Sequence, residues 1–113
     1  MLYVSGITPE LVPGAPAATP YGDTKTQTIS TLKKIKELLA AHGMTMKDIV
    51  RMDAYLVAAP GMDGKMDFAG FNAGFAEFFN NAENPTTTTR TTMQISALAG
   101  PQFLVELTVI AAK

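Results

Sequence analysis

The amino-acid sequence predicts a single α+β domain over residues 1–113, in which a mixed β-sheet carries two helices on one face. Segments with the two-residue periodicity of strands alternate along the chain with two segments of helical periodicity. The chain has the length of one ordinary domain, and 47% of its residues are apolar, which is enough to fill one core. No repeat of about 20 to 50 residues is visible, which argues against solenoids and propellers.

The chain begins with a short strand and a loop. Residues 2–4 are β-prone, and Ser5-Gly6 ends the run. The stretch from residue 8 to residue 22 contains four prolines and two glycines, and it is therefore expected to be a loop.

A helix is expected from Asp23 or Thr24, because either residue can cap the first turn. Thr24 and Gln27 fit the spacing of a reciprocal capping box. Gly43 is expected to end the helix as its C′ residue. His42 lies in the last turn, where a cation is favoured by the helix dipole, and we interpret it as a capping or surface residue rather than a catalytic one.

The middle of the chain predicts a strand over residues 49–58 and a second helix over residues 66–80, with Pro60-Gly61 between them. One face of the strand is expected to be buried: Val50, Met52, Ala54 and Leu56. The helix carries five phenylalanines on one stripe, which predicts a face buried in the core: Phe68, Phe71, Phe75, Phe78 and Phe79.

Two strands are expected to close the chain. The threonine-rich segment from residue 86 leads into one strand, and residues 103–111 form the other after a turn at residues 98–101. We predict that these strands pair as a hairpin. On this prediction, the side that meets the helices carries Met93, Ile95, Val105 and Leu107.

The other side of this predicted hairpin mixes polar and apolar side chains. It would carry Arg90, Thr92, Gln94 and Ser96 on one strand and Leu104, Glu106, Thr108 and Ile110 on its neighbour. Such a face is too apolar for water along part of its length and too polar elsewhere for a closed core. We therefore expect it to face the interior of an oligomer.

Composition argues against several function classes. The net charge is -1 and no block of like charge is present, so nucleic acid is a poor first candidate for a partner. The chain has no cysteine and one histidine, which argues against thiolate chemistry and clustered metal ligands. The first residues resemble neither a signal peptide nor a membrane anchor, so a cytoplasmic protein is the expectation.

The predicted hairpin brings two charged side chains together. Thr92 would lie opposite Glu106, and Arg90 would lie on the diagonal, roughly 5.5 to 8 Å away. One interpretation is a cross-strand ion pair that holds the strand register. The other is a binding site, in which the arginine binds a substrate carboxylate and the glutamate polarises a water molecule. The residue pattern leaves both interpretations open.

Several segments in order resemble the Rid family, also called the YjgF/YER057c/UK114 family, of enamine and imine deaminases. The resemblance covers almost the whole chain, and it rests on the shared order and spacing of its segments: Leu2 to Gly6; Gln27-Thr28; Leu32 to Ile35; Gly43 with Asp48 to Arg51; Tyr55-Leu56; Asn72 with Phe75 and Phe78-Phe79; Arg90; Val105-Glu106; and Val109 to Ala111.

The resemblance implies a chorismate-mutase-like fold, a homotrimer with sites between subunits, and hydrolysis of small 2-imino or 2-enamino acids to 2-keto acids and ammonia without a cofactor. Arg90 stands where the family's arginine binds the substrate carboxylate, and Gly6 where a backbone N–H helps to hold it. Glu106 stands where a glutamate organises the attacking water. Ser5 and Asn72 match supporting positions.

The chain also departs from the family pattern. It begins at the family's "V-S-G" strand, so the usual preceding strand is expected to be lacking. Thr92 stands where a cysteine is frequent, and we count it among the substrate-binding positions. Two alternatives stay open: a non-catalytic trimer that binds a small carboxylate in the same cleft, and a ribonuclease, an activity described for some members of the family. The acidic charge balance argues against the ribonuclease.

Overall fold

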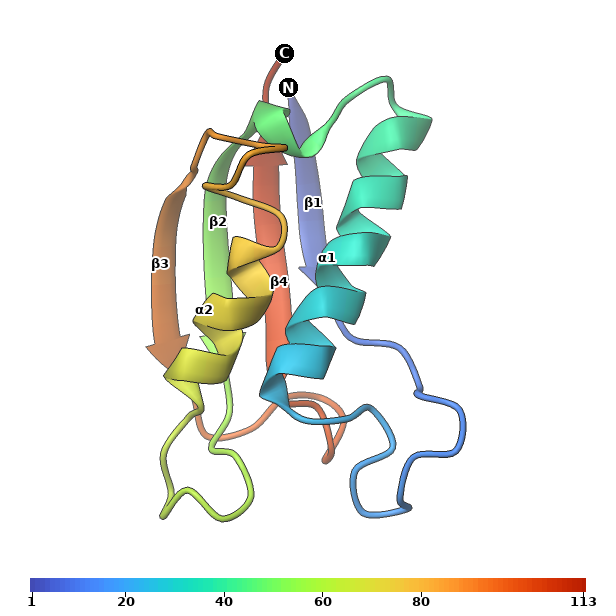
Figure 1. The fold of residues 1–113 in the computed structure, drawn as a ribbon, viewed down its shortest axis with the longest axis vertical. Coiled ribbons are helices and arrows are strands. Elements are labelled where there is room, and N and C mark those ends of the chain that lie inside the picture. Colours follow the sequence, from blue (N-terminus) through green and yellow to red (C-terminus); the bar gives the residue numbers. More distant parts are fainter.

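The computed structural model describes residues 1–113 and confirms an α+β fold with one four-stranded mixed sheet. The strands lie in the spatial order β1-β4-β2-β3. Figure 1 shows both long helices on the same side of this sheet. The elements are β1 (Leu2–Ile7), α1 (Thr24–Ala41), the short 3₁₀ helix η1 (Met46–Asp48), β2 (Ile49–Leu56), α2 (Phe68–Ala76), β3 (Thr89–Gln94) and β4 (Val105–Ala111).

The predicted hairpin of the last two strands is wrong. β3 pairs in parallel with β2, while β4 lies antiparallel between β1 and β2. The parallel pair follows from α2, which carries the chain back across the sheet between β2 and β3. β4 alternates buried and half-buried residues along its whole length, whereas β3 is largely exposed. The more apolar strand therefore takes a central position, and the threonine-rich strand takes an edge.

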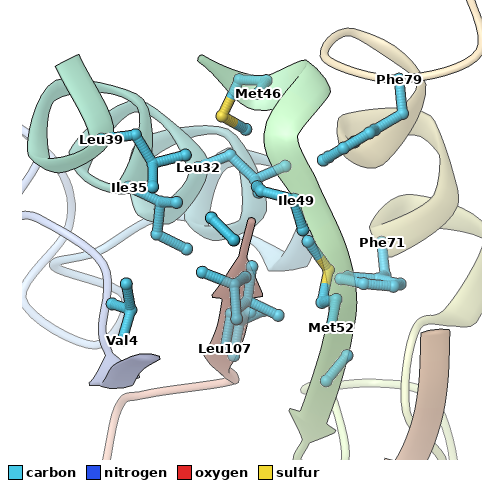
Figure 2. Close-up of a cluster of buried hydrophobic side chains, with 14 of the residues drawn as sticks. Val4, Leu32, Ile35, Leu39, Met46, Ile49, Met52, Phe71, Phe79 and Leu107 are labelled. Atoms are coloured by element: carbon cyan, nitrogen blue, oxygen red, sulfur yellow. The ribbon is translucent and has the colours of Figure 1, made fainter. Parts of the chain in front are cut away.

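The core lies between the helices and the covered face of the sheet. Leu32, Ile35 and Leu39 project from α1 toward Met52 and Leu107 of the sheet, and all five are fully buried (Figure 2). Burial of one such side chain contributes about 1.5 to 3 kcal/mol. The prediction that alternate residues of β2 and β4 face the helices is confirmed by the burial of Met52, Ala54, Leu56, Val105 and Leu107.

Several details of the predicted strand faces are wrong. Arg90 and Thr92 lie on the face that the helices cover, opposite Met52 and Ala54, and not on the other face as predicted from the hairpin. Val50 is 46% exposed rather than buried, because the register of β2 shifts between its neighbours Ile49 and Arg51. Met93 pairs with Tyr55 on the uncovered face and is 39% exposed. The error at Val50 comes from this local shift, since a shift of one residue moves a side chain to the other face of a sheet. The error at Met93 comes from the predicted hairpin, because β3 pairs with β2 in an unbroken register.

The ends of α1 confirm part of the expected capping. Asp23 is the N-cap, and its carboxylate accepts a hydrogen bond of 2.8 Å from the backbone N–H of Thr26. Thr24 is the first helical residue, so the predicted capping box that starts at Thr24 is wrong. The interpretation of His42 as a capping or surface residue is confirmed, because it is exposed and its Nδ1 lies 2.9 Å from the carbonyl oxygen of Leu38.

Gln27 has a structural role instead of the predicted cap. Its fully buried amide group donates to the carbonyl oxygens of Gly22 at 2.9 Å and Gln102 at 3.1 Å. It also accepts a hydrogen bond of 2.7 Å from the backbone N–H of Leu104. Gln27 therefore fixes the segment that leads into β4 to the start of α1.

The second helix is shorter than predicted and only part of its phenylalanine stripe is buried. The Asp67 side chain caps α2 by accepting from the N–H of Gly70 at 2.9 Å. Phe71 and Phe79 are fully buried, whereas Phe68 is 44% exposed. No helix is both long and apolar enough to cross a membrane.

Candidate functional site

Arg90 lies near the start of β3, on the face of the sheet that the helices cover. Its partner in β2 is Met52, which is fully buried, and paired residues project to the same face. The guanidinium carbon lies over three phenylalanine rings of α2, at 4.6 Å from the centroid of Phe75, 5.1 Å from Phe71 and 5.9 Å from Phe68. We call these three rings the aromatic wall.

The Arg90 cation has no partner of opposite charge within the chain. The two ion pairs join Lys25 to Glu77 and Arg51 to Asp53, and the only arginine side chain that donates a hydrogen bond is that of Arg51. Burial lowers the pKa of the Arg90 guanidinium below its ordinary value, because desolvation disfavours the charged form.

The aromatic wall does not use the hydrogen-bonding capacity of this cation. Each cation–π contact contributes only about 0.5 to 1 kcal/mol at such a site, and the rings leave the N–H donors of Arg90 without an oxygen acceptor. A carboxylate matches the planar fork of a guanidinium with two parallel hydrogen bonds. The local chemistry therefore suits an anion with this geometry.

Glu106 lies on β4 and projects from the opposite, uncovered face of the sheet. It pairs with Tyr55, which in turn pairs with Met93. The carboxyl group of Glu106 lies against Gly6, in the stretch where the register of β1 against β4 shifts. A Cβ atom built on Gly6 would lie 2.7 Å from Cδ of Glu106. A larger residue at position 6 would therefore displace the carboxyl group of Glu106.

Arg90 and Glu106 do not meet within one chain. They project from opposite faces, and β2 lies between their strands. Arg90 is level with Met52 and Glu106 with Tyr55, so their Cα atoms are about 14 Å apart for regular strand spacing. The predicted pairing of Thr92 with Glu106 is wrong, because it assumed a hairpin. The alternative of an Arg90–Glu106 ion pair within the chain is wrong for the same reason.

The remaining predicted site residues fall into two groups. Thr92 is on the covered face with Arg90, opposite Ala54, and its buried hydroxyl has no hydrogen-bond partner. Asn72 is a half-buried residue of α2, within the helix that carries the aromatic wall. We call Arg90, Thr92, Asn72 and the aromatic wall the arginine half-site. Glu106, Gly6 and the exposed Ser5 form the glutamate half-site.

Two hollows mark the surface of the chain, and neither is lined by Arg90 or Glu106. One, of about 220 Å³, lies between α1, η1 and the segment after α2. The other, of about 350 Å³, lies on the uncovered face and is lined in part by Ser5, Arg51 and Thr108. No three acidic or histidine side chains converge to hold a metal ion.

Sequence reasoning missed the aromatic wall. It assigned Phe68, Phe71 and Phe75 to the core, because a helical stripe of phenylalanines has the same spacing whether it packs on apolar residues or on a cation. The distinguishing fact is that α2 lies beside β3, which follows from the parallel β2–α2–β3 unit. A strand-order prediction that placed the threonine-rich strand at the edge next to β2 would have found this contact.

The fold defines a class of small α+β proteins with a four-stranded mixed sheet covered by two helices. The whole chain, residues 1–113, matches the family model described as Endoribonuclease L-PSP. The chain therefore belongs to this family, which is also known by the names Rid, YjgF and RutC. The resemblance deduced from the sequence is confirmed.

Individual relatives are distant. A RutC family protein of Pyrococcus horikoshii is 32% identical over 92 residues, which are 81% of this chain and 64% of that relative. The structure of Escherichia coli TdcF with bound serine has a TM-score of 0.75 at 24% identity and is matched over 98% of this chain and 79% of that one. A Rid family protein of Yersinia pestis has a TM-score of 0.73 at 24% identity, over 99% and 77% of the two chains. These structures confirm the Rid-type fold.

Proposed function

We propose that this chain is a deaminase that hydrolyses small 2-imino or 2-enamino acids to 2-keto acids and ammonia. The observation that carries the proposal is the Arg90 guanidinium, which is partly desolvated against three aromatic rings and has no carboxylate partner in its own chain. A substrate carboxylate would supply that partner. Membership of the Rid family supports this reaction class, and TdcF was solved with serine, a small carboxylate, bound to it.

The chemistry requires one water molecule and a movable proton. An enamine first takes a proton on carbon and becomes the imine, whose protonated nitrogen makes the neighbouring carbon electrophilic. The water oxygen then forms a bond to this carbon, the C=N electron pair moves to nitrogen, and Glu106 accepts a proton from the water. Glu106 returns its proton to the nitrogen of the tetrahedral intermediate, which makes the nitrogen a leaving group. The C–N bond then breaks and its electrons leave with ammonia, while the hydroxyl oxygen forms the C=O bond and gives up its proton to Glu106.

The separation of the two half-sites implies a site shared between chains. Because Arg90 and Glu106 project from opposite faces of one sheet, one substrate molecule reaches both only if the residues come from different chains. We propose a homotrimer in which the glutamate half-site of one subunit faces the arginine half-site of the next. Cyclic contacts between unlike surfaces close into such rings. The uncovered face, with Tyr3 at 70% exposure, supports a partner on that side.

Two rival functions make different demands on these residues. A non-catalytic carboxylate-binding trimer needs the arginine half-site but not Glu106. A ribonuclease, which the name of the family suggests, needs a basic surface for the phosphate backbone. The net charge of -1 gives no support to that reading.

The test is release of ammonia and keto acid from freshly generated 2-aminoacrylate or 2-iminobutanoate. The native chain should turn over both substrates, and Arg90→Ala and Glu106→Gln should each lose turnover. Carboxylate binding that depends on Arg90, without any turnover by the native chain, would favour the binding trimer. RNA cleavage that survives Arg90→Ala would favour the ribonuclease.

A further inference from the structure

We infer that the arginine half-site selects carboxylates whose side chain, beyond the keto or imine carbon, carries an apolar planar group such as an aromatic ring, and that Phe68 makes this selection. The inference rests on the proposed function, since it uses Arg90 as the carboxylate anchor. It adds a substrate class and a specificity-determining residue.

Phe68 differs from the other two rings of the aromatic wall. Phe71 is fully buried and Phe75 is half-buried, whereas Phe68 is 44% exposed. Phe68 is the first residue of α2, and its ring centroid is 5.9 Å from the guanidinium carbon of Arg90. An exposed ring beside a cation offers a surface that a bound ligand can cover.

The geometry of the cation places a ligand substituent near that surface. Aromatic rings contact Arg90 through their faces, so a carboxylate binds to the N–H donors that remain along the edge of the guanidinium. The side chain of the bound acid can then lie against the wall. An aromatic substituent gains both apolar burial and ring–ring contact there, while a methyl group gains little.

Gln94 holds Phe68 in this position. It is on β3, four residues after Arg90, and therefore projects to the same face. Its side-chain oxygen accepts from the backbone N–H of Met66 at 2.8 Å, and its amide nitrogen donates to the carbonyl oxygen of Gly64 at 2.8 Å. These two bonds fix the loop that enters α2 to the strand that carries Arg90. Gln94 is thus a positioning residue for the exposed ring.

The test compares equilibrium binding of two keto acids, pyruvate and phenylpyruvate, which differ only in the ring. We expect the native chain to bind phenylpyruvate about tenfold more tightly, the ratio expected for one ring–ring contact with its buried area. Phe68→Ala should remove this preference, so that the ratio of the two affinities approaches one, while Phe68→Tyr should keep the ratio of the native chain. Gln94→Met, which keeps the volume but loses both hydrogen bonds, should reduce the preference.

Equal affinities for the two acids in the native chain would overturn the inference, as would a preference that survives Phe68→Ala. A smaller oligomeric mass for Phe68→Ala would show that the ring belongs to a contact between subunits, and this result would also overturn the inference. The binding measurement does not depend on turnover. A chain that prefers phenylpyruvate but has no deaminase activity would therefore support this inference and contradict the proposed reaction. Loss of both ligands in Arg90→Ala is the required control for the anchor.

Discussion

Arg90 and Glu106 project from opposite faces of the same sheet, with β2 between their strands. One residue has an aromatic environment and no counter-ion, and the other lies against the backbone of Gly6. The two groups of candidate site residues therefore face different directions. The consequences of this arrangement for stability, turnover and assembly can be measured separately.

The guanidinium of Arg90 is expected to contribute to carboxylate binding and not to the stability of the fold. A partly buried cation without a counter-ion is costly, and an apolar side chain of similar length can occupy its place against the aromatic wall. We expect Arg90→Met to change the free energy of unfolding by no more than about 1 kcal/mol, while carboxylate binding is lost. Chemical denaturation measures the first and calorimetry the second. Destabilisation by several kcal/mol would show that the guanidinium is structural.

Gly6→Ala is expected to lower turnover without weakening carboxylate binding. The new Cβ would lie 2.7 Å from Cδ of Glu106, so the carboxyl group must move away from its present position. We expect a fall in kcat of at least about tenfold, because misplaced catalytic groups lose rate steeply, and little change in the affinity for keto acids at Arg90. Glu106→Gln serves as the matched control, since it should also lower kcat and leave the affinity for keto acids unchanged. Equal loss of binding and turnover in Gly6→Ala would contradict the assignment.

Most of the fold could be predicted from the sequence, because it depends on local signals. The helix caps, the glycine after α1 and the alternation of Val105, Leu107 and Val109 are set by neighbouring residues. The strand order could not be obtained in this way. Ten residues connect Gln94 to Val105, which is long enough either for a hairpin between β3 and β4 or for a connection that crosses β2. The second arrangement is the one formed, because it buries β4 between two neighbouring strands, β1 and β2.

The same error limited the prediction of the site. Arg90 and Glu106 could be selected from the sequence as candidate site residues, since charges on strands of this kind need an explanation. Their relation was wrong, because cross-strand contacts depend on which strands are neighbours. The environment of Arg90 required knowledge of tertiary packing, whereas the contact of Glu106 with Gly6 required knowledge of a register shift in β1.

Gln27 is expected to be a major stabilising residue. Its buried amide satisfies the carbonyl oxygens of Gly22 and Gln102 and the N–H of Leu104, and loss of such partners costs about 1 to 3 kcal/mol. We expect Gln27→Leu to lower the unfolding free energy by this amount. Gln102→Ala, at an exposed side chain, should change it by less than about 0.5 kcal/mol. Similar effects of the two substitutions in urea denaturation would count against this role.

Carboxylate binding is expected to be independent of pH between about pH 6 and 9, because an arginine stays protonated throughout this range. Burial lowers the folded-state pKa of the Arg90 guanidinium below its ordinary value, because desolvation disfavours the charged form. The cost of burying the cation is thus present at every pH below the folded-state pKa and is relieved only as the pH rises through it, in strong alkali. Titration calorimetry with pyruvate at several pH values checks this. A binding constant that follows a group titrating near neutrality would contradict Arg90 as the anchor.

The most direct test of a shared site is to co-express Arg90→Ala and Glu106→Gln chains and to measure ammonia release by the mixed trimers. Neither variant should be active alone. In a ring of randomly mixed subunits, about one quarter of the interfaces join a native arginine to a native glutamate of the next chain, so about a quarter of the native turnover should return. Mixed trimers as inactive as the two parents, with a native chain that is active, would contradict the account.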